Sequence, residues 1–180
     1  MNILLVNNHT RHIGALSSQL AGHNVEILEY QPGAIFNAKH KDLVILSGGG
    51  GEGREIRDKH KGDLWYKDEL QFILDCPAPM LGICMGFELM AHAYGSPIAT
   101  LDKGLHNFVD FQARDGQAFR QFESHDFAVQ QVSSKHFEVL AESETGIEII
   151  KHHQRPIFAT QFHPELGGSL QLSRLLTIAT

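Results

Sequence analysis

The segment MLGICMGFELMA, Met80–Ala91, decides how the rest of the chain can be arranged. It begins as an apolar strand, breaks at a cysteine between Gly82 and Gly86, and continues with the spacing of a helix. A sharp strand-to-helix turn needs small residues around its nucleophile, because a Cβ there would clash with neighbouring backbone. Cys84 would then stand at the carboxyl edge of a sheet and at the positive end of a helix, which favours the thiolate. The alternative is that Cys84 is a small buried hydrophobic residue, as free cysteines commonly are.

Outward from this segment, the first half of the chain alternates apolar runs typical of strands with runs of helical spacing. Strands are predicted over Asn2–Asn7, Asn24–Tyr30, Asp42–Gly53 and Pro79–Cys84, and helices over Arg11–Ala21, Asp63–Leu74 and Met85–Tyr94. This order predicts an α/β fold with a mostly parallel sheet.

The second half of the chain has a different character, because short strand-like runs alternate there with turn-rich pieces. Strands are predicted around Asn107–Phe111, Ala118–Glu123, Phe137–Ala141, Gly146–Ile150 and Ile157–Phe162, and a closing helix over Ser169–Ile178. We therefore expect an open, mostly parallel sheet flanked by helices, with an antiparallel extension in the second half. Residues 1–180 contain no repeat or linker, so we expect a single domain.

The bulk composition excludes several classes of protein. The chain has 180 residues, 42% hydrophobic and 20% charged, and its net charge of −6 argues against nucleic acid as the main partner. No apolar stretch approaches the ~20 residues of a membrane span, and the start MNILLVNN lacks the features of a signal peptide. With only two cysteines and no metal-type spacing, a cytoplasmic, reducing compartment is expected. The histidine pairs His9/His12 and His152/His153 could bind a metal, but solvated surface is the favoured interpretation.

The segment IFATQFHPEL, Ile157–Leu166, offers the groups that a thiolate nucleophile needs. An apolar strand ends at His163, Pro164 forces the chain out of the strand, and Glu165 follows directly. A nucleophile requires a base, and the base requires an orienting group. His163 and Glu165 are therefore the candidate base and orienting carboxylate for Cys84.

A glycine run follows the third predicted strand, in the segment LSGGGGEG, Leu46–Gly53. Consecutive glycines let backbone N–H groups approach a substrate closely, as an oxyanion hole or a phosphate cradle would. The run matches neither the spacing of a dinucleotide-binding loop nor that of a P-loop, which disfavours the phosphate interpretation. A flexible loop is the remaining alternative.

Taken together, these segments resemble the class I, triad-type glutamine amidotransferases over nearly the whole chain and in the family's order. The segments that carry the resemblance are LSGGG (Leu46–Gly50), GICMG (Gly82–Gly86), ESHDFAV (Glu123–Val129) and FATQFHPE (Phe158–Glu165). The resemblance implies a flavodoxin-like, three-layer fold. It also implies a glutaminase that hydrolyses glutamine to glutamate and ammonia without a cofactor.

The resemblance implies a role for each residue of the expected triad. Cys84 would attack the side-chain amide of glutamine and form a glutamyl thioester. His163 would act as base and then as acid to the leaving ammonia, and Glu165 would orient His163. The oxyanion would be met by the backbone N–H groups of Gly49 and Met85.

Substrate binding and two departures from the family pattern complete the expected site. Ser124, His125 and Asp126 lie in the segment that resembles the family's holder of the substrate α-amino and carboxylate groups. Gly50 stands where the family usually has proline, and Glu88 where it usually has glutamine in contact with the substrate. Spacing of four places Glu88 on the helix face that continues from the turn holding Cys84. The alternative for Glu88 is a favourable acid in the first turn of a helix.

Three functions are consistent with these residues. The expected one is a glutaminase that supplies ammonia to a separate synthase subunit, whose acceptor the sequence leaves open. The pair Phe87–Glu88 also resembles the γ-glutamyl hydrolases, which share the fold and cleave γ-glutamyl bonds without a synthase. A catalytically silent regulatory subunit is the third, and the presence of Cys84, His163 and Glu165 argues against it.

Overall fold

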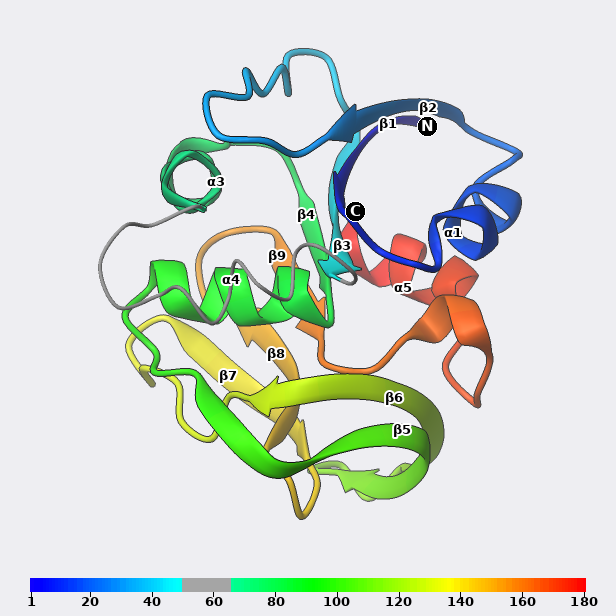
Figure 1. Ribbon diagram of the computed structural model, residues 1–180, viewed down its shortest axis with the longest axis vertical. Helices are drawn as coiled ribbons and strands as arrows, with labels where there is room; N and C mark the ends of the chain where they lie inside the picture. The colour runs from blue at the N-terminus through cyan, green and yellow to red at the C-terminus, as the bar shows by residue number, and fades with distance from the viewer. Residues whose placement is uncertain (50–65) are drawn as a thin grey trace.

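The apolar runs of the first half form a parallel sheet in the computed structural model, which describes residues 1–49 and 66–180 (Figure 1). Its strands are β1 (Asn2–Asn8), β2 (Asn24–Glu29), β3 (Leu43–Gly49), β4 (Met80–Ile83) and, from the end of the chain, β9 (Ile157–Thr160). They pair in parallel in the order β2-β1-β3-β4-β9. Strands β4 and β9 are buried along their whole length, as expected where helices cover both faces of a sheet.

The strands of the second half continue this sheet with antiparallel pairing. They are β5 (Ala99–Ala113), β6 (Ala118–Ala128), β7 (Phe137–Glu142) and β8 (Ile147–His152), in the order β9-β8-β7-β5-β6. The sheet curls, because the last strand in this order meets the segment that follows β9. The backbone N–H of His163 donates to the carbonyl of Phe122 at 2.8 Å, and Gln121 forms a bridge with Gly168. In Figure 1, β5 and β6 accordingly pass below α4.

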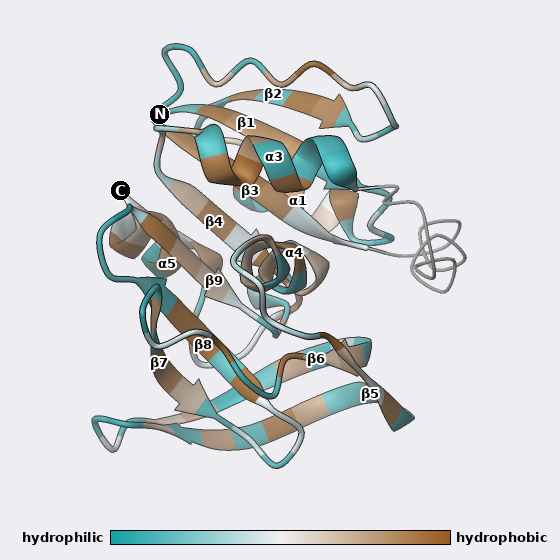
Figure 2. Cartoon of the chain, turned by 90° about the vertical axis from the view of Figure 1, so that its left-hand side faces the viewer, coloured by the Kyte–Doolittle hydropathy of each residue, from teal (hydrophilic) through white to brown (hydrophobic). Residues whose placement is uncertain are grey.

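Helices cover the two faces of the parallel part. Helices α3 (Lys67–Asp75) and α4 (Met85–Ala93) lie on one face, and α1 (Ile13–Gln19) and α5 (Leu172–Ala179) on the other, with the short 3-10 helix η1 (Pro164–Leu166) after β9. Their apolar sides form two buried clusters, one against each face. Figure 2 shows hydrophobic strands in the sheet and, in α3, a helix that carries both hydrophilic and hydrophobic stretches. The result is the three-layer arrangement that the family resemblance implies.

The predicted fold class is therefore confirmed, with differences at particular elements. Strands β5 and β6 are longer than predicted, and the Ser124–Asp126 segment lies inside β6. The helix expected over Asp63–Leu74 is α3, and the beginning of the expected range lies outside the described residues. His152 is buried rather than on solvated surface.

Within residues 1–49 and 66–180, no helix is both long and apolar enough to cross a membrane. The same residues contain no group of three or more histidine, cysteine or acidic side chains that could hold a metal ion.

Candidate active site

The turn between β4 and α4 holds Cys84 in a backbone conformation that side chains rarely adopt. Cys84 has φ 51° and ψ −106°, and it directly precedes the first residue of α4. Such a conformation costs on the order of 1–3 kcal/mol and persists only where surrounding structure holds it. Here the Cys84 N–H donates to the carbonyl of Thr160, and its own carbonyl accepts from the Glu88 N–H. The strained cysteine at the carboxyl end of a parallel strand is the arrangement of a nucleophile elbow.

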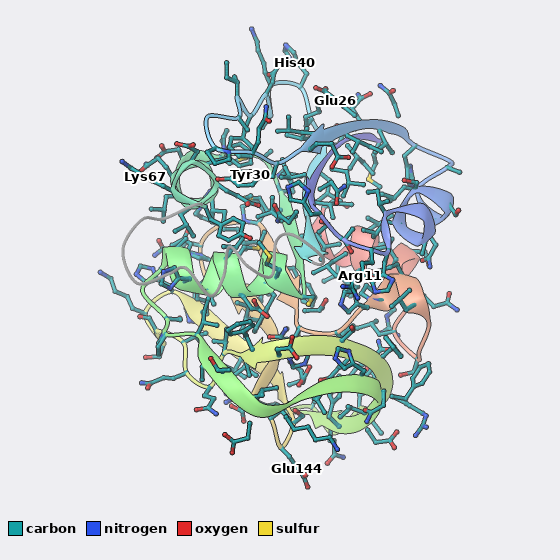
Figure 3. All side chains as sticks on the ribbon, viewed as in Figure 1. Arg11, Glu26, Tyr30, His40, Lys67 and Glu144 are labelled. Carbon is teal, nitrogen blue, oxygen red and sulfur yellow. The ribbon has the colours of Figure 1, made fainter. Side chains whose placement is uncertain are left out.

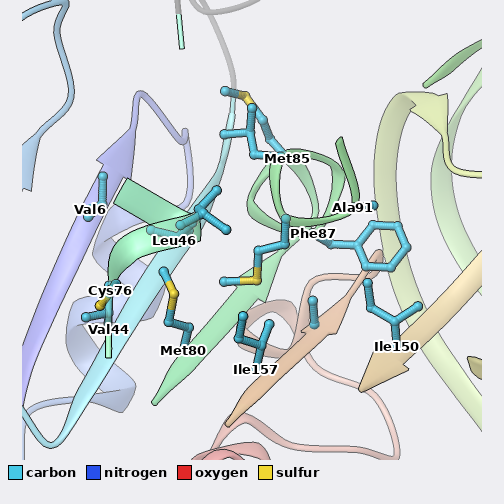
Figure 4. Packing of buried hydrophobic residues seen from close by; sticks show 14 of the residues in the cluster. Val6, Val44, Leu46, Cys76, Met80, Met85, Phe87, Ala91, Ile150 and Ile157 are labelled. Atoms are coloured by element: carbon cyan, nitrogen blue, oxygen red, sulfur yellow. The ribbon is translucent and has the colours of Figure 1, made fainter. Parts of the chain in front are cut away.

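The two glycines beside Cys84 allow the helix to pack directly on the strands. A Cβ added to Gly86 would lie 2.2 Å from the carbonyl oxygen of Leu46 in β3. A Cβ added to Gly82 would lie 2.8 Å from the backbone of Gly86. Figure 4 shows Leu46 and Met80 among the buried side chains packed beneath α4. The glycines are therefore required by close backbone approach, as the sequence pattern predicts.

His163 and Glu165 follow β9, the strand beside β4, and form a buried pair. The Nδ1 of His163 lies 2.7 Å from Oε1 of Glu165, and both side chains are almost completely buried. Because Nδ1 donates its proton to the Glu165 carboxylate, the other ring nitrogen, Nε2, remains available for a second partner. Burial alone would lower the pKa of His163, but the charge of Cys84 and a hydrogen bond with it, together with Glu165, raise the pKa well above its ordinary value.

The end of β3 closes the space around this pair. A Cβ added to Gly48 would lie 2.8 Å from Cε1 of His163 and 3.5 Å from Cβ of Cys84. Gly48 therefore lies against both residues, and its missing side chain leaves the room in which they meet. The structure thus brings together Cys84, His163 and Glu165, which lie far apart in the sequence.

The segment Ser124–Asp126 of β6 forms the opposite wall. The Cys84 thiol donates to the carbonyl of Ser124 at 3.7 Å, and the Ser124 hydroxyl is hydrogen-bonded to Nδ1 of His106 at 3.0 Å. Asp126 lies beside His106, with 4.0 Å between Oδ1 and Nε2. The side chain of His125 lies on the other side of the strand from Ser124 and Asp126, is buried, and feels the charge of Cys84. The contact that this segment makes with Cys84 itself comes from the backbone carbonyl of Ser124.

The family model described as "Glutamine amidotransferase class-I" matches residues 4–178. The chain belongs to the class I glutamine amidotransferase family. The resemblance inferred from the sequence is therefore confirmed.

Individual members of this family show how far the similarity extends. The chain is 32% identical to a glutamine-hydrolyzing GMP synthase subunit of Methanothermobacter thermautotrophicus over 106 residues, which are 54% of this chain and 56% of that one. It is 30% identical to the carbamoyl phosphate synthase arginine-specific small chain of Eremothecium gossypii over 164 residues, 86% of this chain and 40% of that one. These alignments cover about half the length of the curated relatives.

A solved structure supports the amidotransferase fold over the full length of the chain. It is described as "a putative gmp synthase subunit a protein" from Thermoplasma acidophilum, and it superposes with a TM-score of 0.80 at 22% identity. The superposition covers 99% of this chain and 94% of that chain. At this identity the similarity concerns the fold alone.

Glu88 is the one of the two departures from the family pattern that lies within the described residues. It lies in the first turn of α4, is 1% exposed, and accepts a hydrogen bond from Nε2 of Gln161 at 3.2 Å. Both alternatives for Glu88, a contact with the substrate and a favourable acid in the first turn of a helix, place it in this turn. Its burial puts the carboxylate in the polar interior beside Gln161.

The two expected oxyanion donors lie at the ends of the elements that meet at Cys84. Gly49 is the last residue of β3, and Met85 is the first residue of α4. N–H groups in the first turn of a helix have no partner inside the helix, which leaves the Met85 N–H suited to a negative charge. Gly50 and the rest of the glycine run lie outside the described residues.

His12 is a residue of the site that the sequence interpretation missed. Its ring meets the ring of His163 edge-on, with 5.2 Å between centroids and 73° between planes. Burial lowers the pKa of His12, and the charges of His163 and Arg11 lower it further. Figure 3 labels Arg11, where the chain enters α1 beside η1. The signal that could have found His12 is its place just after β1, because the carboxyl ends of parallel strands share one sheet edge.

Proposed function

We propose that this chain hydrolyses glutamine to glutamate and ammonia. The observation that carries the proposal is the strained Cys84 at the start of α4, with the buried His163–Glu165 pair in reach of its thiol. This constellation is that of an activated cysteine nucleophile with a base and an orienting carboxylate. Membership of the class I amidotransferase family supports glutamine as the substrate.

The reaction follows from the positions of these groups. The thiol proton resides on His163, and the Cys84 thiolate attacks the amide carbon of glutamine. As the tetrahedral intermediate collapses, His163 gives its proton to the leaving nitrogen, and ammonia departs from a glutamyl thioester. His163 then takes a proton from water, whose oxygen attacks the thioester, and glutamate leaves as the thiolate is restored.

Backbone donors and the β6 segment supply the remaining interactions of the proposal. The N–H groups of Gly49 and Met85 stabilise the oxyanion, which is a contribution of several kcal/mol in comparable sites. The wall formed by Ser124 and Asp126 holds the α-ammonium and α-carboxylate of the substrate.

Glu88 supports this site from its buried side through Gln161. We predict that Glu88→Gln keeps glutamine hydrolysis, because the amide oxygen of the new side chain can still accept from Gln161. A loss of about 100-fold in kcat/KM, roughly 2.7 kcal/mol, would identify Glu88 as a substrate ligand instead.

A synthase subunit is proposed to consume the ammonia in the cytoplasm. One relative is named as a GMP synthase subunit, the other as the small chain of a carbamoyl phosphate synthase, which supports a separate partner. No step of the proposed hydrolysis needs a cofactor.

The test measures ammonia and glutamate after incubation with glutamine or with a γ-glutamyl dipeptide, each with and without extract of the source cells. Equal release of both products from glutamine, abolished in Cys84→Ala, is expected. The matched control is Cys76→Ala, since Cys76 is buried at the end of α3, in the other apolar cluster, and should leave product release intact. Cleavage of the dipeptide without glutaminase activity would refute the proposal in favour of a γ-glutamyl hydrolase.

A further inference from the structure

Beneath the Ser124 segment lies a set of buried polar side chains, two of which, Glu123 and Glu148, have no role in the family pattern or in the proposed mechanism. We call it the Glu123 cluster, and its members are Glu88, Glu123, His125, Glu148 and Gln161. All of them are 3% exposed or less, and they come from β6, β8, α4 and the segment after β9. Burying several ionisable groups is costly unless they are paired.

The hydrogen bonds of His125 fix its charge. Its Nε2 lies 2.8 Å from Oε2 of Glu123, and its Nδ1 lies 2.6 Å from the carbonyl oxygen of Phe127. A carbonyl only accepts, so Nδ1 must donate to Phe127. The pKa of His125 is raised to about 9, so at neutral pH Nε2 carries a proton as well and the ring is an imidazolium that donates to Glu123.

One carboxylate oxygen of Glu123 and one of Glu148 still need a hydrogen-bond donor. Oε1 of Glu123 and Oε2 of Glu148 are both buried and have no donor among the described groups. Ser143 already donates to the other oxygen of Glu148 at 2.7 Å. One proton shared between the two carboxyl groups satisfies both orphaned oxygens, and burial together with the charge of Glu123 raises the pKa of Glu148 to about 8. The shared proton accordingly belongs to Glu148, and the other oxygen of Glu123 faces His125.

Charged groups from every neighbouring element face His125. They are Glu123 on its own strand, Glu148 on β8, Glu88 on α4 and the nucleophile Cys84. Burial would lower the pKa of His125, but the hydrogen bond with Glu123 and the charges of Cys84, Glu123 and Glu88 raise it to about 9. The cation is therefore retained at neutral pH in the neighbourhood of Cys84.

The cluster is coupled to the site through the backbone of β6. Residues alternate across a strand, so Glu123 and His125 face the interior while Ser124 and Asp126 face the opposite side. The carbonyl of Ser124 contacts the Cys84 thiol, and the carbonyl of Phe127 is held by the His125 ring. The segment that lines the site is thus pinned from its buried side.

We propose that Glu123 and Glu148 are positioning residues for the glutamine site: they hold His125 as an imidazolium and thereby fix the Ser124–Phe127 backbone beside Cys84. The kinetic part of this inference rests on the proposed glutaminase function. The charge state of His125 is independent of that function and is measured separately.

The first test is the protonation of His125 in the full chain, by ¹H–¹⁵N NMR of the histidine rings at pH 6 to 10. The His125 signal is assigned by its loss in His125→Asn. Both ring nitrogens are expected to be protonated at pH 7, with a titration midpoint near 9. A ring with one protonated nitrogen at pH 7 overturns the proposal, whatever the enzyme does with glutamine.

The second test compares three variants at Glu123 and Glu148. Glu123→Gln removes the anion and is expected to leave His125 neutral at pH 7.5 and to raise KM for glutamine about tenfold, the equivalent of one charge-assisted hydrogen bond. Glu148→Leu removes the shared proton and is expected to raise KM in the same direction. Glu148→Gln is the rescuing variant, because its amide N–H can still donate to Glu123, and its KM should match that of the wild type.

The control is Glu144→Gln, which removes an exposed carboxylate in the turn between β7 and β8 (Figure 3). It should leave the His125 signal and KM unchanged. Unchanged KM and an unchanged His125 signal in Glu123→Gln would overturn the proposal. If Glu123→Gln does not fold, the proposal is decided by the titration of His125 in the wild type and by the comparison of Glu148→Leu with Glu148→Gln. If the wild type shows no glutaminase activity, the proposed function fails, whereas the titration still decides the charge of His125.

Discussion

Replacing Gly86 by alanine should displace the helix that presents Cys84. Gly86 is the second residue of α4, and its added Cβ would lie 2.2 Å from the carbonyl oxygen of Leu46. Ordinary van der Waals contact needs roughly 3.5 Å, so the helix or β3 must move by about 1 Å. Overpacking of this kind typically costs 1–3 kcal/mol, and the obstacle here is backbone rather than a flexible side chain.

We therefore expect Gly86→Ala to lower the free energy of unfolding by about 3 kcal/mol, at the upper end of that range. For a domain of this size the melting temperature should fall by roughly 6–12 °C. The measurement is urea denaturation followed by circular dichroism, with a thermal scan as a second probe. Glutamine hydrolysis should be lost, because Cys84 directly precedes the displaced helix.

Gly14 offers a matched control, because it is also the second residue of a helix, α1, and nothing lies within 4 Å of its added Cβ. Alanine is the better helix former, so Gly14→Ala should stabilise the protein by about 0.5–1 kcal/mol. Because the two substitutions should change the free energy of unfolding in opposite directions, the comparison isolates the effect of the clash with Leu46. A Gly86→Ala variant as stable as wild type would refute the account of the elbow.

Three further substitutions have expected outcomes. Gly48→Ala places a Cβ 2.8 Å from Cε1 of His163, and kcat/KM for glutamine should fall by about 100-fold as the ring is displaced; unchanged kinetics would contradict the site geometry. Glu165→Gln removes the charge that helps raise the pKa of His163, so NMR should record a lower His163 pKa and kinetics a loss of ~100-fold or more; an unchanged pKa would count against the pairing. Burial raises the pKa of Glu69 to about 8 despite a hydrogen bond from Asn8, so the stability gained by its protonation is lost as pH rises from 4.5 to 8. In Glu69→Gln the unfolding free energy should fall less over that range, and denaturation curves as steep in pH as those of wild type would contradict this.

The parts of the fold that the sequence predicted best are those with uninterrupted apolar runs. Strands β1, β3 and β4 are buried on both faces, so their central residues are hydrophobic without alternation and the runs stand out. The turn that holds Cys84 was equally predictable from the sequence, because close backbone contact requires glycine at positions 82 and 86. Both signals arise from local constraints on residue type.

The length of the β5–β6 hairpin could not be predicted from apolar runs in the sequence. β5 pairs mainly with β6 and is largely exposed, so it carries lysine, aspartate and asparagine at positions where no core selects an apolar residue. Its extent is set by pairing along the chain rather than by burial. The segment Ser124–Asp126 was found by motif, yet its place inside a strand was missed for this reason.

The contacts made across the curled sheet were also beyond sequence reasoning. Glu123 and Glu148 lie on strands that are not neighbours in the sheet, and only the curl brings their carboxyl groups together. His12 reaches His163 because α1 packs beside η1. These contacts depend on how the elements are arranged in space, which no local pattern encodes.

The central claim is that Cys84 forms a covalent glutamyl intermediate, and trapping that intermediate tests it most directly. The full chain, with cell extract in a parallel sample, is mixed with glutamine, quenched in acid, digested and analysed by mass spectrometry. We predict one glutamyl group on the peptide that contains Cys84, with none on the peptide that contains Cys76 and none in Cys84→Ala. Release of glutamate and ammonia with no adduct on Cys84, in samples quenched across the first turnover, would contradict the account.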